Sequence, residues 1–361
     1  MCGIVGYVGR SEAAPILLEG LSRLEYRGYD SAGICVEKNG VLEVEKAKGR
    51  LQNLIAKTEN GAKLPGTLGI GHTRWATHGE PNDINSHPHV SQNGKIAIVH
   101  NGIIENYLEI REFLQEKGVQ FASQTDSEVV AQLMEYCMGL PEVSTVSDAL
   151  YMVLHRIEGA YALGILCSDD PDHIYAARKD APLLLGFGKG ENFIASDVTA
   201  LVKYTRDVVY MEDGEVAILG RDGIQIFNAM ELPIEKEHHH IDWEISAAEK
   251  GGYEHFMIKE IMEEPEALRR AILPRIKDGE VVFDGLQLDI SRYDSIKIIA
   301  CGSSYHVGVV GKYNLEKLVR IPVEAVLASE FRYCDPIIDN RTLVIVISQS
   351  GETLDTMAAL R

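Results

Sequence analysis

The chain has 361 residues, of which 45% are apolar and 25% are charged, values typical of a globular protein large enough for two domains. Its formal net charge of −19 repels nucleic acid and anionic membrane surfaces, so we expect neither as a partner. The sequence has no apolar run of about 18 residues and no signal-peptide pattern, which predicts a cytoplasmic protein. Six cysteines occur without a CxxC pair, so we expect no metal and no cofactor.

Short β-rich runs alternate with amphipathic helices in the first part of the chain. GIVGYVG at residues 3–9 predicts a strand, and residues 11–28 predict a helix capped by Ser11. Hairpins are predicted at three Asn-Gly or Asp-Gly turns, which are Asn39-Gly40, Asp213-Gly214 and Asp222-Gly223. Helical periodicity recurs at residues 102–118 and 125–138. Hairpins and helices in this order indicate antiparallel sheets covered by helices.

A polar stretch, PIEKEHHHIDWEISAAEKGG, breaks this pattern and predicts a boundary. We therefore assign a first domain to residues 1–240, a linker to 241–252 and the start of a second domain to 253–361. The second part has a long helical segment and then two strand, turn and helix units. The apolar run LVIVI is typical of a strand buried on both faces of a parallel sheet, so this part reads as a doubly wound α/β domain.

Cys2 has a position that suggests chemistry. Removal of Met1 would leave its thiol beside a free α-amine, whose usual pKa of about 8 suits it to accept the thiol proton. A thiolate is the nucleophilic form of cysteine. The pattern is weak alone, because many proteins begin with Met-Cys by chance.

Three stretches rich in Gly, Arg, His and Asn follow, where a core would be apolar: LEYRGYDSAG, GIGHTRWATHGEPNDINSHPHV and AIVHNGIIEN. Such residues gather at binding sites, although a polar surface loop is the alternative. Arg74 can pair with a carboxylate, Thr77 and His78 can donate hydrogen bonds, and Trp75 can form an apolar wall.

Asn101 and Gly102 are expected where a strand meets a helix, where a side-chain amide and a backbone N–H can form an oxyanion hole. A structural cap is an equal alternative there. Asp126 is equally plausible as the N-cap residue of the next helix.

Residues 1 to about 240 resemble the glutamine-hydrolysing domain of the N-terminal-nucleophile amidotransferases. Four ordered motifs, EYRGYDSAG, GHTRWATHG, HNGIIEN and SQSGET, resemble the amino-sugar-forming branch of that family. The resemblance implies a four-layer αββα α+β domain followed by an incomplete doubly wound α/β sugar-isomerase domain. It also implies a glutamine-dependent aminotransferase that converts fructose 6-phosphate to glucosamine 6-phosphate, with a homodimer as the assembly.

The same resemblance implies roles for individual residues. Cys2 would attack the side-chain amide of glutamine, with Asn101 and Gly102 holding the oxyanion. The glutamine site would be formed by Arg27, Arg74, Trp75, Thr77, His78, His87 and Asp126. A purely structural role for His87 is an equal alternative.

The second part would bind the sugar phosphate at turns that each follow a strand and open a helix. The residues concerned are Ser303, Ser304, Ser348, Gln349, Ser350 and Thr353. Because a domain of this kind needs roughly 100 residues or more, we expect the chain to be a fragment that hydrolyses glutamine only.

Two other interpretations stay open. A related amidotransferase would feed ammonia to phosphoribosyl pyrophosphate or an aspartyl adenylate, but the second part lacks a nucleotide motif. A sugar-phosphate-sensing regulatory protein with a non-catalytic first domain would not need a terminal thiol together with Arg74 and Asn101.

Overall fold

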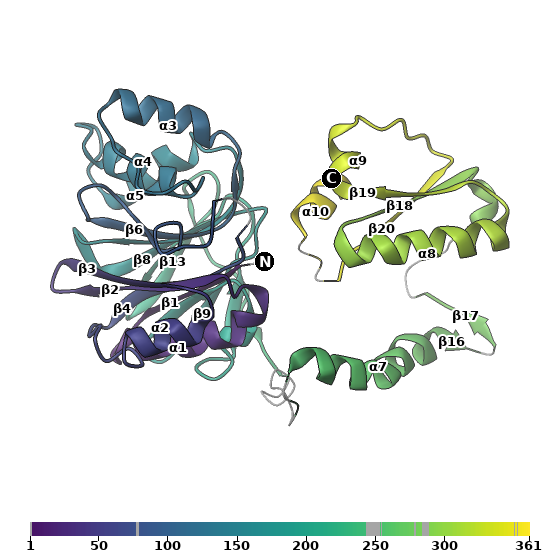
Figure 1. Ribbon diagram of the computed structural model, residues 1–361, viewed down its shortest axis with the longest axis horizontal. Helices are drawn as coiled ribbons and strands as arrows, with labels where there is room; N and C mark the ends of the chain where they lie inside the picture. The colour runs from purple at the N-terminus through teal and green to yellow at the C-terminus, as the bar shows by residue number, and fades with distance from the viewer. Residues whose placement is uncertain are drawn as a thin grey trace. The chain divides into compact units, whose positions relative to one another are not determined.

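The computed structural model describes residues 2–76, 79–242, 253, 255–277, 279–283, 289–349, 351 and 353–361. The chain forms two compact units, Met1–Ile245 and Ser246–Arg361. Figure 1 labels the helices and strands of both units.

Two antiparallel sheets lie at the centre of the first unit (Figure 1). The first sheet has eight strands in the spatial order β15 (His239–His240), β11 (Asp207–Tyr210), β9 (Leu184–Phe187), β10 (Asn192–Ala195), β1 (Gly3–Val8), β4 (Leu68–Arg74), β2 (Ser31–Lys38) and β3 (Val41–Lys48). The second sheet has seven in the order β14 (Pro233–Ile234), β13 (Gly223–Phe227), β12 (Val216–Gly220), β8 (Asp170–Lys179), β7 (Gly159–Cys167), β6 (Ile96–Ile104) and β5 (His89–Val90).

Helices cover the outer face of each sheet. The first sheet carries α1 (Ala13–Leu24) and α2 (Leu51–Lys57), and the second carries α3 (Tyr107–Glu116), α4 (Glu128–Met138) and α5 (Val146–Leu154) (Figure 1). Short 3₁₀ turns occupy Glu25–Arg27 and Val198–Ala200. This arrangement is the predicted four-layer αββα fold.

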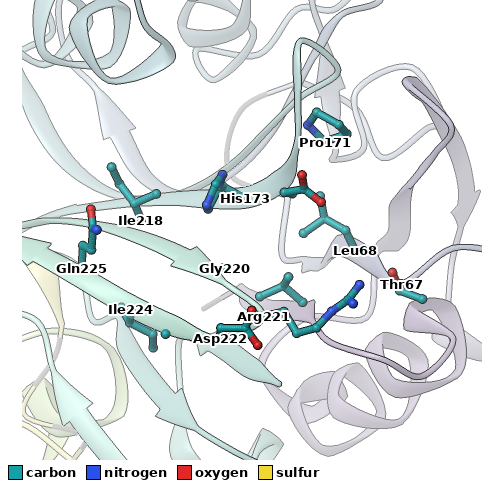
Figure 2. Close-up of a pocket in the computed structure, with 13 residues that line it drawn as sticks. Thr67, Leu68, Pro171, His173, Ile218, Gly220, Arg221, Asp222, Ile224 and Gln225 are labelled. Carbon is teal, nitrogen blue, oxygen red and sulfur yellow. The ribbon is translucent and has the colours of Figure 1, made fainter. Parts of the chain in front are cut away.

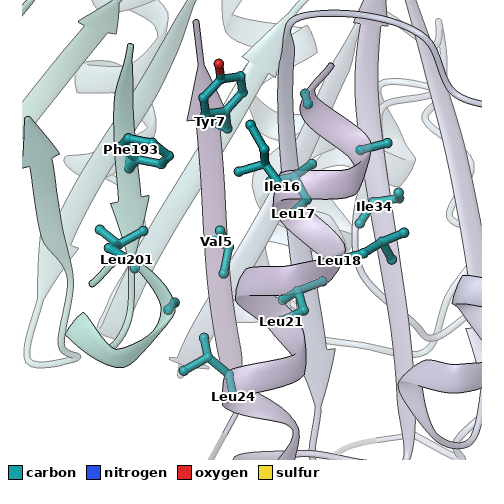
Figure 3. Packing of buried hydrophobic residues seen from close by; sticks show 14 of the residues in the cluster. Val5, Tyr7, Ile16, Leu17, Leu18, Leu21, Leu24, Ile34, Phe193 and Leu201 are labelled. Carbon is teal, nitrogen blue, oxygen red and sulfur yellow. The ribbon is translucent and has the colours of Figure 1, made fainter. Parts of the chain in front are cut away.

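Apolar side chains fill each of the three interfaces between these layers. Figure 3 shows the interface between the first sheet and its helices, where Leu17 and Leu21 of α1 face Val5 of β1. All three of these side chains are at most 1% exposed. Their burial fixes β1, and with it the start of the chain, against the helix layer.

Two local predictions for this unit were wrong. Helix α1 begins at Ala13 without a side-chain cap, because the Ala13 N–H donates to the Gly66 carbonyl at 2.7 Å instead of to Ser11. The Asp213-Gly214 turn forms no hairpin, since β11 and β12 belong to different sheets and the turn carries the chain between them. The other two hairpins are confirmed as the pairs β2–β3 and β12–β13, but the second turns at Arg221-Asp222, because Gly223 already pairs with Gly220.

The second unit contains the helix α7 (Phe256–Ile272), a two-stranded ribbon and a parallel sheet. The ribbon pairs β16 (Ile276–Lys277) with β17 (Glu280–Val281), and 3₁₀ turns occupy Leu273–Arg275 and Ile290–Arg292. The sheet has the order β19 (Val323–Leu327), β18 (Ser295–Ala300), β20 (Thr342–Ile347), with α8 (Gly302–Val319), α9 (Ala328–Tyr333) and α10 (Leu354–Leu360). The strand over LVIVI is parallel as predicted, but it lies at the edge of the sheet and is partly exposed.

Candidate active site

Cys2 lies directly before β1, and its thiol contacts the backbone of Trp75. The Trp75 N–H donates to Sγ at 3.2 Å, and Sγ lies 3.6 Å from the Trp75 carbonyl oxygen. Burial raises the pKa of the Cys2 thiol, while the Trp75 N–H bond and the Arg74 charge act to lower it. The thiol is therefore protonated at neutral pH and needs a base before it can act as a nucleophile.

The pairing of β1 with β4 brings Cys2 next to Arg74. Gly3 is paired with Thr73, so Cys2 lies at the same end of the sheet as the last residue of β4. A Cβ atom on Gly3 would lie 2.7 Å from both Leu24 Cβ and Thr73 Oγ1, which is shorter than a van der Waals contact. Glycine at position 3 therefore lets this strand pack closely against α1 and β4.

Asn101 and Gly102 lie within β6, which continues to Ile104. The expectation that they occupy a strand-to-helix junction was wrong, because α3 begins only at Tyr107. The Asn101 Nδ2 group donates to the Cys2 carbonyl oxygen at 3.1 Å and so crosses from the second sheet to the first. Gly102 has a φ of 129°, and a side chain there would collide with the Ala160 carbonyl. Only glycine suits this position.

Arg74 is buried at the end of β4, with 5% of its surface exposed. Its guanidinium donates to the carbonyl of Gly79 at 3.2 Å and to that of Glu80 at 3.5 Å. Burial lowers the pKa of Arg74, and the charges of Cys2, Asp126 and Asp30 oppose that effect. The Cys2 thiol, the Arg74 guanidinium and two carboxylates therefore lie close enough to affect one another's charge.

Asp126 is not the N-cap of α4, because that position belongs to Ser127. Its Oδ2 atom accepts a hydrogen bond from the Ile104 N–H at 2.8 Å. This contact fixes the carboxylate against the end of β6, the strand that carries Asn101.

Arg27 and His87 lie in packed surroundings. Arg27 forms an ion pair with Asp197 at 3.3 Å and donates to the Ser196 carbonyl, also at 3.3 Å. The Ser196 hydroxyl in turn accepts the Ile4 N–H at 2.9 Å, so Ser196 connects Arg27 to β1. His87 is 4% exposed and accepts the His100 N–H through Nδ1 at 3.2 Å.

The Trp75 side chain is 43% exposed and packs edge-on against Tyr29, with ring centroids 5.3 Å apart. Thr77 and His78 follow directly but lie outside the described residues. The structure thus brings together Cys2 and the backbone of the segment whose aromatic side chain was predicted to line the site.

Two residues near the nucleophile were not predicted from the sequence. His72 Nε2 lies 3.0 Å from Asn101 Oδ1 and 3.1 Å from the His100 carbonyl oxygen. Asp30 Oδ2 accepts the Ala76 N–H at 2.8 Å and so anchors the segment that contacts the thiol. Strand alternation offered a signal for His72, since it lies two residues before Arg74 and hence on the same face of β4.

A cavity of about 580 Å³ opens at the opposite end of the two sheets (Figure 2). Its lining includes Val8, at the end of β1, and Leu68, at the start of β4, whereas Cys2 and Arg74 lie at the other ends of these strands. A smaller cavity of about 400 Å³ includes Glu80, whose carbonyl accepts from Arg74. The smaller cavity therefore lies beside the segment whose carbonyl groups bind Arg74.

The described residues of the predicted sugar-phosphate site lie at the carboxyl end of the parallel sheet in the second unit. Ser303 and Ser304 lie in the first turn of α8, and Ser348 and Gln349 follow β20. Ala300 and Ile347 are paired and are the last residues of their parallel strands, so both turns lie at the same carboxyl end of the sheet. Thr353 precedes α10, and Ser350 lies outside the described residues.

Two negative findings concern the described residues. No group of three or more His, Cys, Asp or Glu side chains among them has an arrangement that could hold a metal ion. In the same part of the chain, no helix is both long and apolar enough to cross a bilayer.

Family models match both parts of the chain. Residues 72–203 match a glutamine amidotransferase domain, and residues 289–361 match a SIS domain. The first match contains Arg74, Asn101 and Asp126, and the second contains all of the predicted sugar-phosphate residues.

Curated relatives match over the whole chain. The isomerizing glutamine–fructose-6-phosphate aminotransferase of Caldanaerobacter subterraneus subsp. tengcongensis is 56% identical over 365 residues, which cover 100% of this chain and 59% of that protein. Proteins of the same name from Thermus thermophilus and Pyrococcus horikoshii are 49% and 48% identical, and the matches cover 100% of this chain and 59% and 60% of those proteins. The chain thus spans about three fifths of the length of these relatives.

Solved structures agree on the fold. The structure of the allosteric regulatory enzyme of purine biosynthesis has a TM-score of 0.56 and 29% identity, covering 63% of this chain and 49% of that one. The glutamine phosphoribosylpyrophosphate amidotransferase of B. subtilis has a TM-score of 0.56 and 21% identity, covering 94% of this chain and 69% of that one. The latter identity supports a shared fold alone.

Proposed function

Because the chain belongs to the family of the isomerizing glutamine–fructose-6-phosphate aminotransferases, we propose that its first unit hydrolyses glutamine at Cys2. The single observation that carries this proposal is the position of Cys2 between the Trp75 backbone and the Asn101 amide. We assign the glutaminase domain to residues 1–240 and the start of the sugar-isomerase domain to residues 253–361. Ammonia released at Cys2 would serve to convert fructose 6-phosphate to glucosamine 6-phosphate.

The base in this reaction is the α-amine that removal of Met1 gives to Cys2. In the described part of the chain, the hydrogen bonds of the thiol go to the backbone of Trp75, and no side chain is within bonding distance. The nearby His72 is unsuited to the task, because burial lowers its pKa to about 3. The amine takes the thiol proton, and the thiolate sulfur bonds to the amide carbon of glutamine.

The negative charge that develops on the amide oxygen needs donors already in place. Asn101 Nδ2 carries two hydrogens and uses one for the Cys2 carbonyl oxygen, which leaves a second for the oxyanion. We propose that the Gly102 N–H is the other donor. The protonated amine then transfers its proton to the leaving nitrogen, ammonia departs, and water hydrolyses the thioester to glutamate and the free thiol.

Recognition of the amino-acid end of glutamine rests on opposite charges. Arg74 would bind the α-carboxylate and Asp126 the α-ammonium, because both charges act on the same neighbourhood as Cys2. Trp75, Thr77 and His78 would line the site, and Arg27 and His87 would support it from behind.

The substrate of the second unit would be fructose 6-phosphate. Two turns with hydroxyl and amide groups meet at one edge of its sheet, and exposed backbone N–H groups at helix starts suit a phosphate. We also propose that the protein acts in the cytoplasm as a homodimer.

The test is to incubate the wild type and Cys2→Ala with glutamine and to measure glutamate, together with the mass of the mature N-terminus. Loss of a nucleophile costs a factor of about 10⁶ in other hydrolases, so glutamate release should fall below detection. A wild type that is active with Met1 still attached would contradict the mechanism. A chain that binds sugar phosphate but releases no glutamate would instead be the regulatory sensor.

A further inference from the structure

Four buried histidines form a cluster of ring contacts, and one of them, His72, lies within hydrogen-bond distance of Asn101. His72, His87, His89 and His100 are each at most 4% exposed. The His87 ring stacks on His72 at 4.2 Å and meets His89 edge-on at 4.5 Å. Burial lowers the pKa of all four imidazoles. Each ring is therefore neutral at physiological pH and has one N–H.

The hydrogen-bond partners of His72 decide which nitrogen carries its proton. Nε2 lies within bonding distance of two oxygen atoms, Asn101 Oδ1 and the His100 carbonyl, and a carbonyl can only accept. Among the described residues, the buried Nδ1 atom has no hydrogen-bond partner. The proton therefore lies on Nε2, and Nδ1 has no hydrogen to satisfy.

This tautomer fixes the orientation of the Asn101 amide. Oδ1 faces the N–H of His72, and Nδ2 faces the Cys2 carbonyl oxygen. A flipped amide would place its NH₂ group against the His72 N–H and its oxygen against the Cys2 carbonyl. Both contacts would be repulsive, so the flipped state is disfavoured at both ends.

We propose that His72 is a positioning residue for glutamine hydrolysis, because its Nε2–H keeps the Asn101 amide turned with Nδ2 toward Cys2. The inference rests on the proposed function and deepens it. A donor that is held in place before the reaction stabilises the oxyanion without reorganisation. Loss of His72 should therefore lower kcat, while KM, which reports on groups such as Arg74, should change little.

The test compares three variants of the full chain in steady-state glutaminase assays. His72→Phe keeps an aromatic ring against His87 but removes the N–H. His72→Gln restores a donor, because its Nε2 atom can occupy nearly the same place as the histidine Nε2. His89→Phe is the matched control, since His89 is an equally buried member of the cluster whose Nε2 bonds Thr125 and not Asn101.

We expect His72→Phe to lower kcat by about 10–100-fold, which is less than the 10²–10³-fold effect of removing an oxyanion donor. His72→Gln should recover most of this loss, and His89→Phe should keep kcat within about threefold of the wild type. Unchanged kcat in His72→Phe, equal losses in both Phe variants, or no recovery in His72→Gln would overturn the proposal. If His72→Phe does not fold, His72→Asn replaces it, because its shorter amide cannot reach Asn101.

Alkylation separates this inference from the proposed function. Iodoacetamide reacts with the Cys2 thiolate without forming an oxyanion, so its rate should be the same in the wild type and His72→Phe. A wild type that is alkylated but does not hydrolyse glutamine contradicts the proposed function. Slower alkylation in His72→Phe would place the defect in the thiol and overturn the positioning role.

Discussion

The two candidate sites differ in how far their polar groups are fixed before a ligand arrives. In the first unit, hydrogen bonds join Cys2 to Asn101 and Asn101 to His72, across two sheets and with His72 fully enclosed. In the second unit, the Ser348 hydroxyl accepts the N–H of Gly351 within its own turn, and Ser303 is exposed.

This difference follows from the task that each site would perform. Stabilising a transient charge requires donors that do not need to reorganise, which a network between two sheets provides. Binding a stable phosphate requires only that the turns close around it. The free energy needed to order the turns then weakens the binding. The predictions below test the contrast between a fixed site and an open one.

The largest effect is expected at the Asn101 amide. Asn101→Ala should lower kcat for glutamine by about 10²–10³-fold, the usual result of removing one oxyanion donor. Steady-state assays measure it, and Asn192→Ala is the control because it removes a different asparagine amide, which is buried and donates to the Gly220 carbonyl at 2.7 Å. If Asn101→Ala kept its turnover, Asn101 would have only a structural role.

A smaller effect is expected for the carboxylate contact. Arg74→Lys keeps the charge but removes the guanidinium fork, so KM for glutamine should rise by about 10–100-fold, equivalent to about 1.5–3 kcal/mol. Arg221→Lys is the control, because Arg221 lines the distant cavity and donates to the Gly9 carbonyl. An equal rise in KM for both variants would indicate that glutamine does not bind specifically at Arg74.

The buried histidines predict an acid dependence of stability in the fixed region. Burial, followed by the charges of Lys46 and Arg74, holds the pKa of His89 well below its usual range. Below pH 6.5 the unfolded chain takes up a proton that the folded His89 does not, so stability falls as the pH is lowered. His89→Phe should make this slope shallower by up to about 1.4 kcal/mol per pH unit, measured by urea unfolding between pH 7.5 and pH 5.5. An unchanged slope would mean that His89 titrates normally in the folded state.

The smallest effect is expected in the open region. Ser348→Ala removes one hydroxyl, so affinity for fructose 6-phosphate should fall by about 2–10-fold in calorimetric titrations, with glutamine hydrolysis unchanged. Ser295→Ala is the matched control, because that hydroxyl lies at the other end of the sheet, 3.1 Å from Thr342 Oγ1. Equal losses in both variants would place the sugar phosphate elsewhere.

Much of the fold could be predicted because its signals are local. The leucines of α1 follow the helical period, and the Asn39-Gly40 turn closes β2 directly onto β3. The Asp213-Gly214 turn looks the same in sequence, yet it joins two sheets. Turn residues report that the chain reverses, but they do not report which strand it pairs with afterwards.

The site was predictable in its residue types but not in its contacts. Cys2, Arg74 and Asn101 lie near one another as expected, whereas Arg27 meets Asp197, which is 170 residues away along the chain. The role of His72 depends on which face of β4 meets the second sheet. The spacing of GHTRW places His72 on the same face as Arg74, but packing between the layers decides that this face meets Asn101.

The hydrogen bond from Asn101 to the Cys2 carbonyl has a mechanical consequence. The proposed nucleophile belongs to one sheet and the proposed oxyanion donor to the other, so the distance between them is set by the thickness of the apolar layer in between. Ile70 and Val99 are both fully buried in that layer, so their volumes help to set the distance between the two sheets. Interiors are close-packed, so a change of one methylene there shifts the sheets by a fraction of an ångström. On the proposed mechanism, the rate of glutamine hydrolysis is therefore adjustable at positions that glutamine would not contact.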